Sequence, residues 1–139
     1  MVKRRITTAL FWAYLGVLLR ITVFRSGWYH NSLFGGTVVW LPFQASFLPL
    51  TEGRWWDFLY LFVGNMVWFA PMGAYLRCRR QSFLPGLLWT ALLSLAIEVL
   101  QFVLSTGCSE VEDLLLNTAG GCLGWLAAHL ICKRRSAVT

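Results

Sequence analysis

The stretch FLPGLLWTALLSLAIEVLQFVL, Phe83–Leu104, is an apolar segment with an acidic residue, Glu98, inside it. At about 22 residues it is long enough to cross the roughly 30 Å hydrocarbon core of a bilayer as an α-helix. Its side chains do not alternate in polarity as membrane β-strands require, so a strand fits poorly. The stretch therefore predicts a transmembrane helix that carries a carboxylate.

Three further apolar segments of roughly 19–22 residues accompany it. They cover residues 6–24, 55–76 and 114–132. Of the 139 residues, 58% are hydrophobic and only 13% charged, whereas soluble domains carry about a quarter charged residues. The sequence therefore predicts an all-α integral membrane protein with four transmembrane helices, forming a single domain over residues 1–139.

Basic residues cluster beside these segments. The clusters are Lys3, Arg4 and Arg5; Arg77, Arg79 and Arg80; and Lys133, Arg134 and Arg135. All of them lie inside the cell if the N-terminus is cytoplasmic, as the positive-inside rule requires. The net charge of +6 thus indicates membrane topology rather than nucleic-acid binding. We expect both termini in the cytoplasm, and an uncleaved first helix because no small-residue cleavage site follows it.

The segment between the first two helices, residues 25–54, is expected to be a non-helical, apolar outer loop with Pro42 and Pro49 as helix breakers. It should lie on the membrane surface or dip between helices. A plain interfacial loop and a functional loop fit the sequence equally well. The aromatic residues expected at the interface are Trp28, Tyr29, Trp55 and Trp56.

Polar residues of the third segment share one helical face. They are Thr90, Ser94, Glu98, Gln101 and Ser105. A carboxylate in hydrocarbon costs about 2.5–3.5 kcal/mol, so hydrogen-bonding neighbours are expected. Desolvation would favour the protonated acid and a nearby cation the carboxylate, and both states remain open.

The fourth segment carries Asp113 and Asn117 on one face, followed by the small residues Gly120, Gly121 and Gly124. Gly120 and Gly124 form a GxxxG step, which permits close helix packing within the chain or in a homo-oligomer. Asp113 also suits a simple role as an N-cap or a partner of the helix dipole.

The second segment carries Asn65, then Pro71, which should kink the helix, and Gly73. At 1.5 Å per residue, the polar residues of the last two segments lie at similar depths near the outer side. We therefore predict an outward-facing polar cluster, which acts either as a ligand site or as a set of hydrogen bonds that holds the helices together. Its members are Asn65, Glu98, Gln101, Asp113 and Asn117.

A metal site or cofactor is not expected. The four cysteines, Cys78, Cys108, Cys122 and Cys132, contain no CxxC pair, and the two histidines, His30 and His129, are far apart in sequence.

The stretches NMVWFAPMG, IEVLQF and EVEDLLLNTAGGCLGW, in this order, resemble the VanZ-like family of small bacterial membrane proteins. The resemblance runs from Trp40 to Trp125. Many members have an arginine just before the acidic stretch, where this chain has Cys108, so Arg54 or Arg20 would have to supply that charge. The matching positions are Pro42, Phe43, Asn65, Pro71, Gly73, Glu98, Gln101, Asp113, Asn117, Gly120, Gly121 and Gly124.

The resemblance implies a multi-pass protein of the bacterial cytoplasmic membrane. The family is named for a protein associated with reduced susceptibility to teicoplanin, a lipid-tailed glycopeptide. The main expectation is a non-enzymatic protein that binds membrane lipid, a lipid-linked precursor or the lipoglycopeptide itself. An integral membrane enzyme would use Glu98 as general acid or base with Asp113 as its partner, although the sequence shows no nucleophile–base set. A small transporter would carry protons on Glu98.

Overall fold

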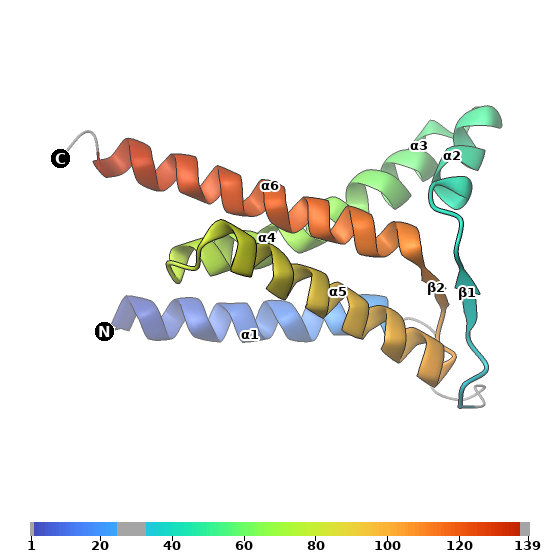
Figure 1. The fold of residues 1–139 in the computed structure, drawn as a ribbon, viewed down its shortest axis with the longest axis horizontal. Helices are drawn as coiled ribbons and strands as arrows, with labels where there is room; N and C mark the ends of the chain where they lie inside the picture. Colours follow the sequence, from blue (N-terminus) through green and yellow to red (C-terminus); the bar gives the residue numbers. More distant parts are fainter. Residues whose placement is uncertain (1, 25–32, 137–139) are drawn as a thin grey trace. The chain divides into compact units, whose positions relative to one another are not determined.

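The computed structural model describes residues 2–24 and 33–136 (Figure 1). The expected interfacial residues Trp28 and Tyr29 lie outside the described residues. The chain divides into two compact units, each described here by itself. Unit 1 comprises Met1–Val38 and Ala96–Ser109, and unit 2 comprises Val39–Leu95 and Glu110–Thr139.

Three helices are long and apolar enough to span a membrane. They are Trp55–Cys78, formed by α3 (Trp55–Phe58), a π-helical turn η1 (Leu59–Val63) and α4 (Gly64–Cys78); α5 (Phe83–Leu104); and residues Val111–Arg134 of α6 (Val111–Ser136). At most 33% of the residues in the apolar part of each is buried inside the protein. Most residues of these helices are therefore not fully enclosed by the rest of the protein.

The first expected span is α1 (Val2–Thr22), a continuous helix of 21 residues. It is not among the three helices that qualify by length and composition. Arg4 and Arg5 in its first turns and Arg20 in its last turn shorten its apolar stretch. Three of the four spans predicted from the sequence are therefore supported by the structure.

Unit 1 joins the end of α5 to the chain that precedes the second span. The backbone N–H of Phe34 donates to the carbonyl of Val103 at 2.9 Å, and that of Gly36 to Phe102 at 3.3 Å. A Cβ at Gly36 would lie 2.6 Å from Phe102 Cα, so only glycine fits there. Strand β1 (Thr37–Val39) follows and pairs with β2 (Cys108–Glu110), a small sheet that the all-α prediction did not include.

Within residues 25–54, the expectation of a non-helical loop broken by Pro49 is wrong. Residues Gln44–Thr51 form helix α2 with Pro49 inside it. Proline cannot donate the backbone hydrogen bond of a helix, but aromatic packing stabilises this one. The Phe47 ring lies 5.6 Å from that of Phe58 and 6.1 Å from that of Phe62, between centroids.

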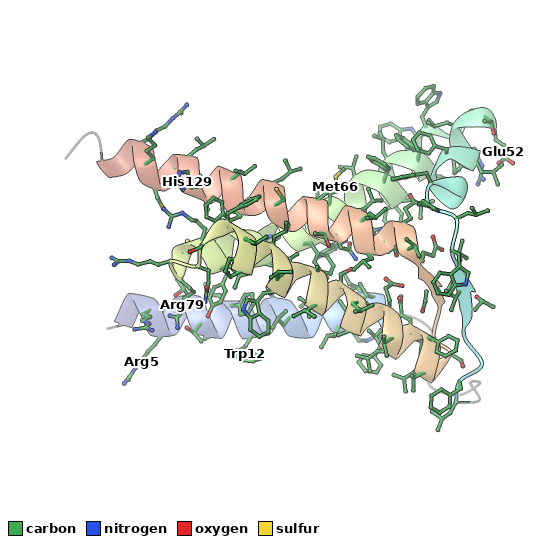
Figure 2. All side chains as sticks on the ribbon, in the orientation of Figure 1. Arg5, Trp12, Glu52, Met66, Arg79 and His129 are labelled. Atoms are coloured by element: carbon green, nitrogen blue, oxygen red, sulfur yellow. The ribbon has the colours of Figure 1, made fainter. Side chains whose placement is uncertain are left out.

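In unit 2, α4 and α6 run side by side in the same direction (Figure 1). Their backbones touch at glycines: a Cβ at Gly120 would lie 2.1 Å from the carbonyl oxygen of Met66, which Figure 2 labels, and one at Gly124 would lie 1.9 Å from that of Ala70. Gly73 of α4 packs equally closely against Gly121. The Gly120–Gly124 face is therefore filled by α4 within the chain.

Candidate functional site

Three helices of unit 2 bring polar side chains together. Asn65 on α4 donates its side-chain N–H to Asp113 Oδ1 on α6. One turn further along α6, Asn117 donates to Ser94 Oγ on α5 at 2.9 Å, and both of these residues are buried. Asp113 and Asn117 are four residues apart and so share one face of α6. We call these four residues, with Glu112, the α6 polar cluster.

Glu112 is the member that the sequence analysis missed. Its side chain is only 2% exposed, and its Oε2 accepts the backbone N–H of Phe43 at 2.9 Å. The first turn of α6 favours carboxylates because the helix dipole is positive there. The three acids of EVED showed that the start of this helix is acidic, but the partner of Glu112 lies 69 positions away, so no local pattern identified which acid is buried.

Two acceptor atoms of the cluster lack a hydrogen-bond donor among the described residues: Glu112 Oε1 and Asn117 Oδ1. Both residues are more than nine-tenths buried. A buried polar group without a partner costs about 1–3 kcal/mol, which a donor from outside the chain would recover. Carboxylate and amide oxygens accept hydrogen bonds from water, hydroxyl, amide or ammonium groups. The cluster is thus suited to a ligand that donates hydrogen bonds.

Unit 1 holds the other two predicted ligand-binding residues. Glu98 is 7% exposed, and its backbone carbonyl accepts the Ser109 hydroxyl at 2.6 Å. Gln101 donates its side-chain N–H to the carbonyl of Thr22 at 3.3 Å, while its Oε1 has no partner among the described residues. Of the five predicted residues, Asn65, Asp113 and Asn117 therefore fall in unit 2, whereas Glu98 and Gln101 fall in unit 1.

The two arginines considered as substitutes for the family's missing arginine are both engaged elsewhere. Arg54 forms exposed ion pairs with Glu52 at 2.7 Å and Asp57 at 2.8 Å. Arg20 donates to the carbonyl of Phe24, within its own unit. Neither contact reaches the α6 polar cluster.

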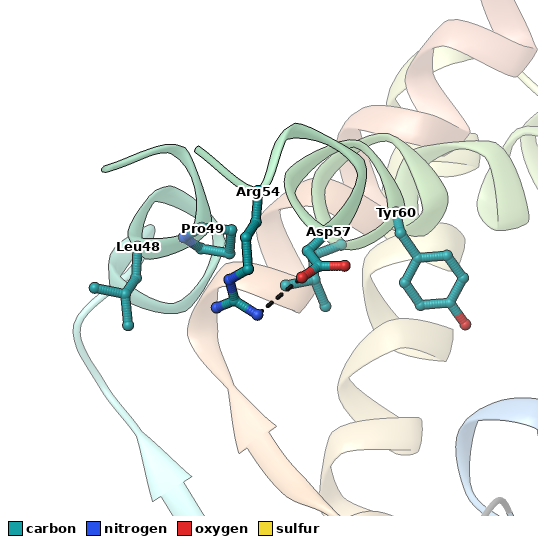
Figure 3. Close-up of a pocket in the computed structure, with 6 residues that line it drawn as sticks. Leu48, Pro49, Arg54, Asp57 and Tyr60 are labelled. Atoms are coloured by element: carbon teal, nitrogen blue, oxygen red, sulfur yellow. Dashed lines mark hydrogen bonds and ion pairs between the residues drawn. The ribbon is translucent and has the colours of Figure 1, made fainter. Parts of the chain in front are cut away.

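A cavity of about 300 Å³ lies beside Arg54, between α2 and α3 (Figure 3). The guanidinium group of Arg54 is already paired with the carboxylates of Glu52 and Asp57, so an incoming ligand would meet no unpaired charge of Arg54. The cavity is a weaker candidate than the α6 polar cluster for this reason. Its lining residues are Leu48, Pro49, Arg54, Asp57, Tyr60 and Leu61.

Glu110 lies immediately before α6, outside the membrane-spanning segment. Desolvation by burial, and secondly the charge of Glu112, raise the pKa of Glu110 above its ordinary value. The protonated form of Glu110 is therefore favoured more than that of an exposed glutamate.

Comparison with known proteins gives two matches. The VanZ/LLP1 family model matches residues 11–132. Protein VanZ from Enterococcus faecium is 34% identical over 64 residues, which make up 45% of this chain and 40% of that protein. The matched region thus covers less than half of the curated relative. No solved structure matches the chain.

Proposed function

This chain belongs to the VanZ/LLP1 family, and from that premise we propose that it is a bacterial envelope protein that reduces susceptibility to lipoglycopeptide antibiotics such as teicoplanin. It does so by binding a lipid or a lipid-linked molecule at the α6 polar cluster. One observation carries the proposal: the buried Glu112 Oε1 and Asn117 Oδ1 have no donor among the described residues.

The chemistry of these two atoms defines the ligand class. Both accept hydrogen bonds, so the ligand presents donors, such as the hydroxyl or ammonium group of a lipid headgroup or the hydroxyl and amide groups of a lipid-linked cell-wall precursor. The helices around the cluster expose large apolar side chains, among them Val67 and Leu115, which suit an acyl chain. If the protein binds such a molecule at the membrane surface, this would hinder a drug that anchors there by its own lipid tail.

The distribution of basic and acidic residues supports the membrane orientation that this function requires. Because α4 and α6 are parallel, Arg77 and Arg134 lie towards one end of unit 2, and Glu112 and Asp113 towards the other. The positive-inside rule assigns the basic end to the cytoplasm and the cluster to the outer side. We propose further that α1 is the fourth span and that both termini are cytoplasmic, in the cytoplasmic membrane.

The test compares teicoplanin with vancomycin susceptibility in a sensitive bacterial host that expresses the wild-type chain or a variant. Asn117→Ala and Glu112→Gln should abolish protection against teicoplanin, because each alters an acceptor in the cluster. Thr118→Ala is the matched control for Asn117→Ala: Thr118 is the next residue of α6, and its hydroxyl donates to the carbonyl of Leu114 in its own helix. Membrane levels are measured for every variant.

Full protection by both cluster variants at wild-type membrane levels would contradict the proposal. Glu98→Gln, measured in parallel, tests whether the buried acid of unit 1 takes part as well. A well-expressed wild-type chain that gives no protection would remove the resistance role altogether. Lipid and precursor masses from the same cells would then test for an enzyme.

A further inference from the structure

Beyond the proposed function, the opposite end of unit 2 carries a fixed guanidinium group. Arg77 donates Nε–H to His129 Nδ1 at 3.2 Å, and its guanidinium carbon lies 5.5 Å from the Trp125 ring centroid. His129 stacks on Trp125 at 5.1 Å with an angle of 10° between the rings. Figure 2 labels His129 near the end of α6. The Arg77 side chain is therefore held in place by two aromatic rings.

The charge of Arg77 is not neutralised within the described residues. His129 accepts the hydrogen bond at Nδ1, so that nitrogen carries a lone pair and not a proton. No described aspartate or glutamate forms an ion pair with Arg77, since both ion pairs found there involve Arg54. Arg77 is half-buried, and removing a charge from water is costly unless the charge is paired. This arginine is thus positioned for an anion from outside the chain.

The turn after α4 adds a second cation at an unfavourable backbone position. Arg80 has a φ of 63°, and its N–H bonds to the carbonyl of Arg77 at 2.9 Å, while the N–H of Gln81 bonds to Leu76 at 3.0 Å. These two bonds form a Schellman motif, in which glycine usually occupies the left-handed position. The indole N–H of Trp125 donates to the Gln81 carbonyl at 3.2 Å and ties the turn to α6. Arg80 thus occupies a left-handed backbone position that glycine would adopt without strain.

We propose that this end of unit 2 binds the phosphate group of an anionic phospholipid. Guanidinium groups bind phosphate in a bidentate manner, and basic pockets between transmembrane helices recognise anionic headgroups. Three exposed basic residues, Arg79, Lys133 and Arg134, lie towards the same end of α4 and α6 as Arg77. The exposed apolar side chains of Leu126, Leu130 and Ile131 on the same part of α6 favour a lipid over free phosphate. We call the three exposed basic residues, with Arg77 and Arg80, the basic end.

The test uses the purified, delipidated full chain in a nonionic detergent. Phosphatidylglycerol binding is measured by native mass spectrometry against phosphatidylcholine and inorganic phosphate. The wild type should prefer phosphatidylglycerol, and Arg77→Gln should weaken that binding about fivefold or more. Arg54→Gln, which removes an exposed arginine from the other end of unit 2, is the matched control and should leave the affinity unchanged.

Arg80→Gly separates binding from folding. It should raise the thermal stability, because glycine accepts the left-handed conformation, and at the same time weaken phosphatidylglycerol binding. Unchanged lipid affinity in a folded Arg80→Gly protein would overturn the proposal, as would equal binding of phosphatidylcholine. Displacement of the lipid by an equal concentration of inorganic phosphate would also contradict it. This variant decides the matter even if Arg77→Gln fails to fold.

Discussion

The backbone N–H of Phe43 donates to Glu112 Oε2 at 2.9 Å, across 69 positions of sequence. Phe43 has a φ of 66°, a left-handed conformation that costs a non-glycine residue about 1–2 kcal/mol. A hydrogen bond within a protein contributes about 0.5–1.5 kcal/mol, which is comparable to this strain. The first turn of α6 therefore fixes the chain immediately before α2, and with it the aromatic packing of Phe47.

The Phe43–Glu112 contact makes a prediction about stability. Glu112→Ala should lower the free energy of unfolding by about 0.5–1.5 kcal/mol, because it removes the acceptor of the part-buried N–H of Phe43. Glu112→Gln keeps an acceptor oxygen and should cost clearly less. Unfolding in mixed micelles with increasing dodecyl sulfate measures both. Glu52→Gln, at an exposed acid, should have almost no effect, and an equal loss in all three variants would contradict this account.

The parallel contact of α4 and α6 depends on the absence of side chains. A Cβ at Gly124 would lie 1.9 Å from the Ala70 carbonyl oxygen, so Gly124→Ala must push the helices apart. We expect a loss of about 1–3 kcal/mol in unfolding free energy. Gly64→Ala is the control, because a Cβ there would meet no described residue of another element within 4 Å, and it should be neutral or stabilise by about 0.5–1 kcal/mol. Equal effects of the two substitutions would refute the packing described here.

The hydrogen bond from Asn65 to Asp113 predicts energetic coupling between α4 and α6. A double-mutant cycle with Asn65→Ala and Asp113→Ala should give a coupling of about 0.6–1.7 kcal/mol, the range of interhelical hydrogen bonds in membranes. The cycle is measured by the same unfolding experiment. Strictly additive single effects would mean that the two side chains do not stabilise the fold together.

Glu110 predicts a pH dependence. Desolvation, with the charge of Glu112 second, raises the pKa of Glu110 above 4.5 in the folded protein. The stability from this group is therefore fully present below 4.5 and is lost as pH rises through the raised pKa. Glu110→Gln should remove this component from a series of melting temperatures taken up to neutral pH. A wild-type curve that is flat over this range, or an unchanged curve in the variant, would contradict the shift.

By itself, the sequence determined the long apolar helices, because a run of apolar residues long enough to cross a bilayer leaves the backbone few other ways to satisfy its hydrogen bonds. The expected segment at 83–104 coincides with α5, and that at 55–76 with α3, η1 and α4. Helical periodicity also placed Asp113 and Asn117 on one face of α6, since this depends only on residues one turn apart.

Only the tertiary structure decided what depends on residues distant in sequence. Three features rest on contacts that no local pattern encodes: the partner of Glu112, the helix that holds Pro49 and the β1–β2 pairing. Burial is likewise a property of the packed helices: Glu112 is 2% exposed, whereas Glu52 is exposed, although both are glutamates of predominantly apolar surroundings in the sequence. The physical reason is that the burial and the hydrogen-bond partners of a carboxylate depend on the atoms packed around it, and those atoms come from other parts of the chain.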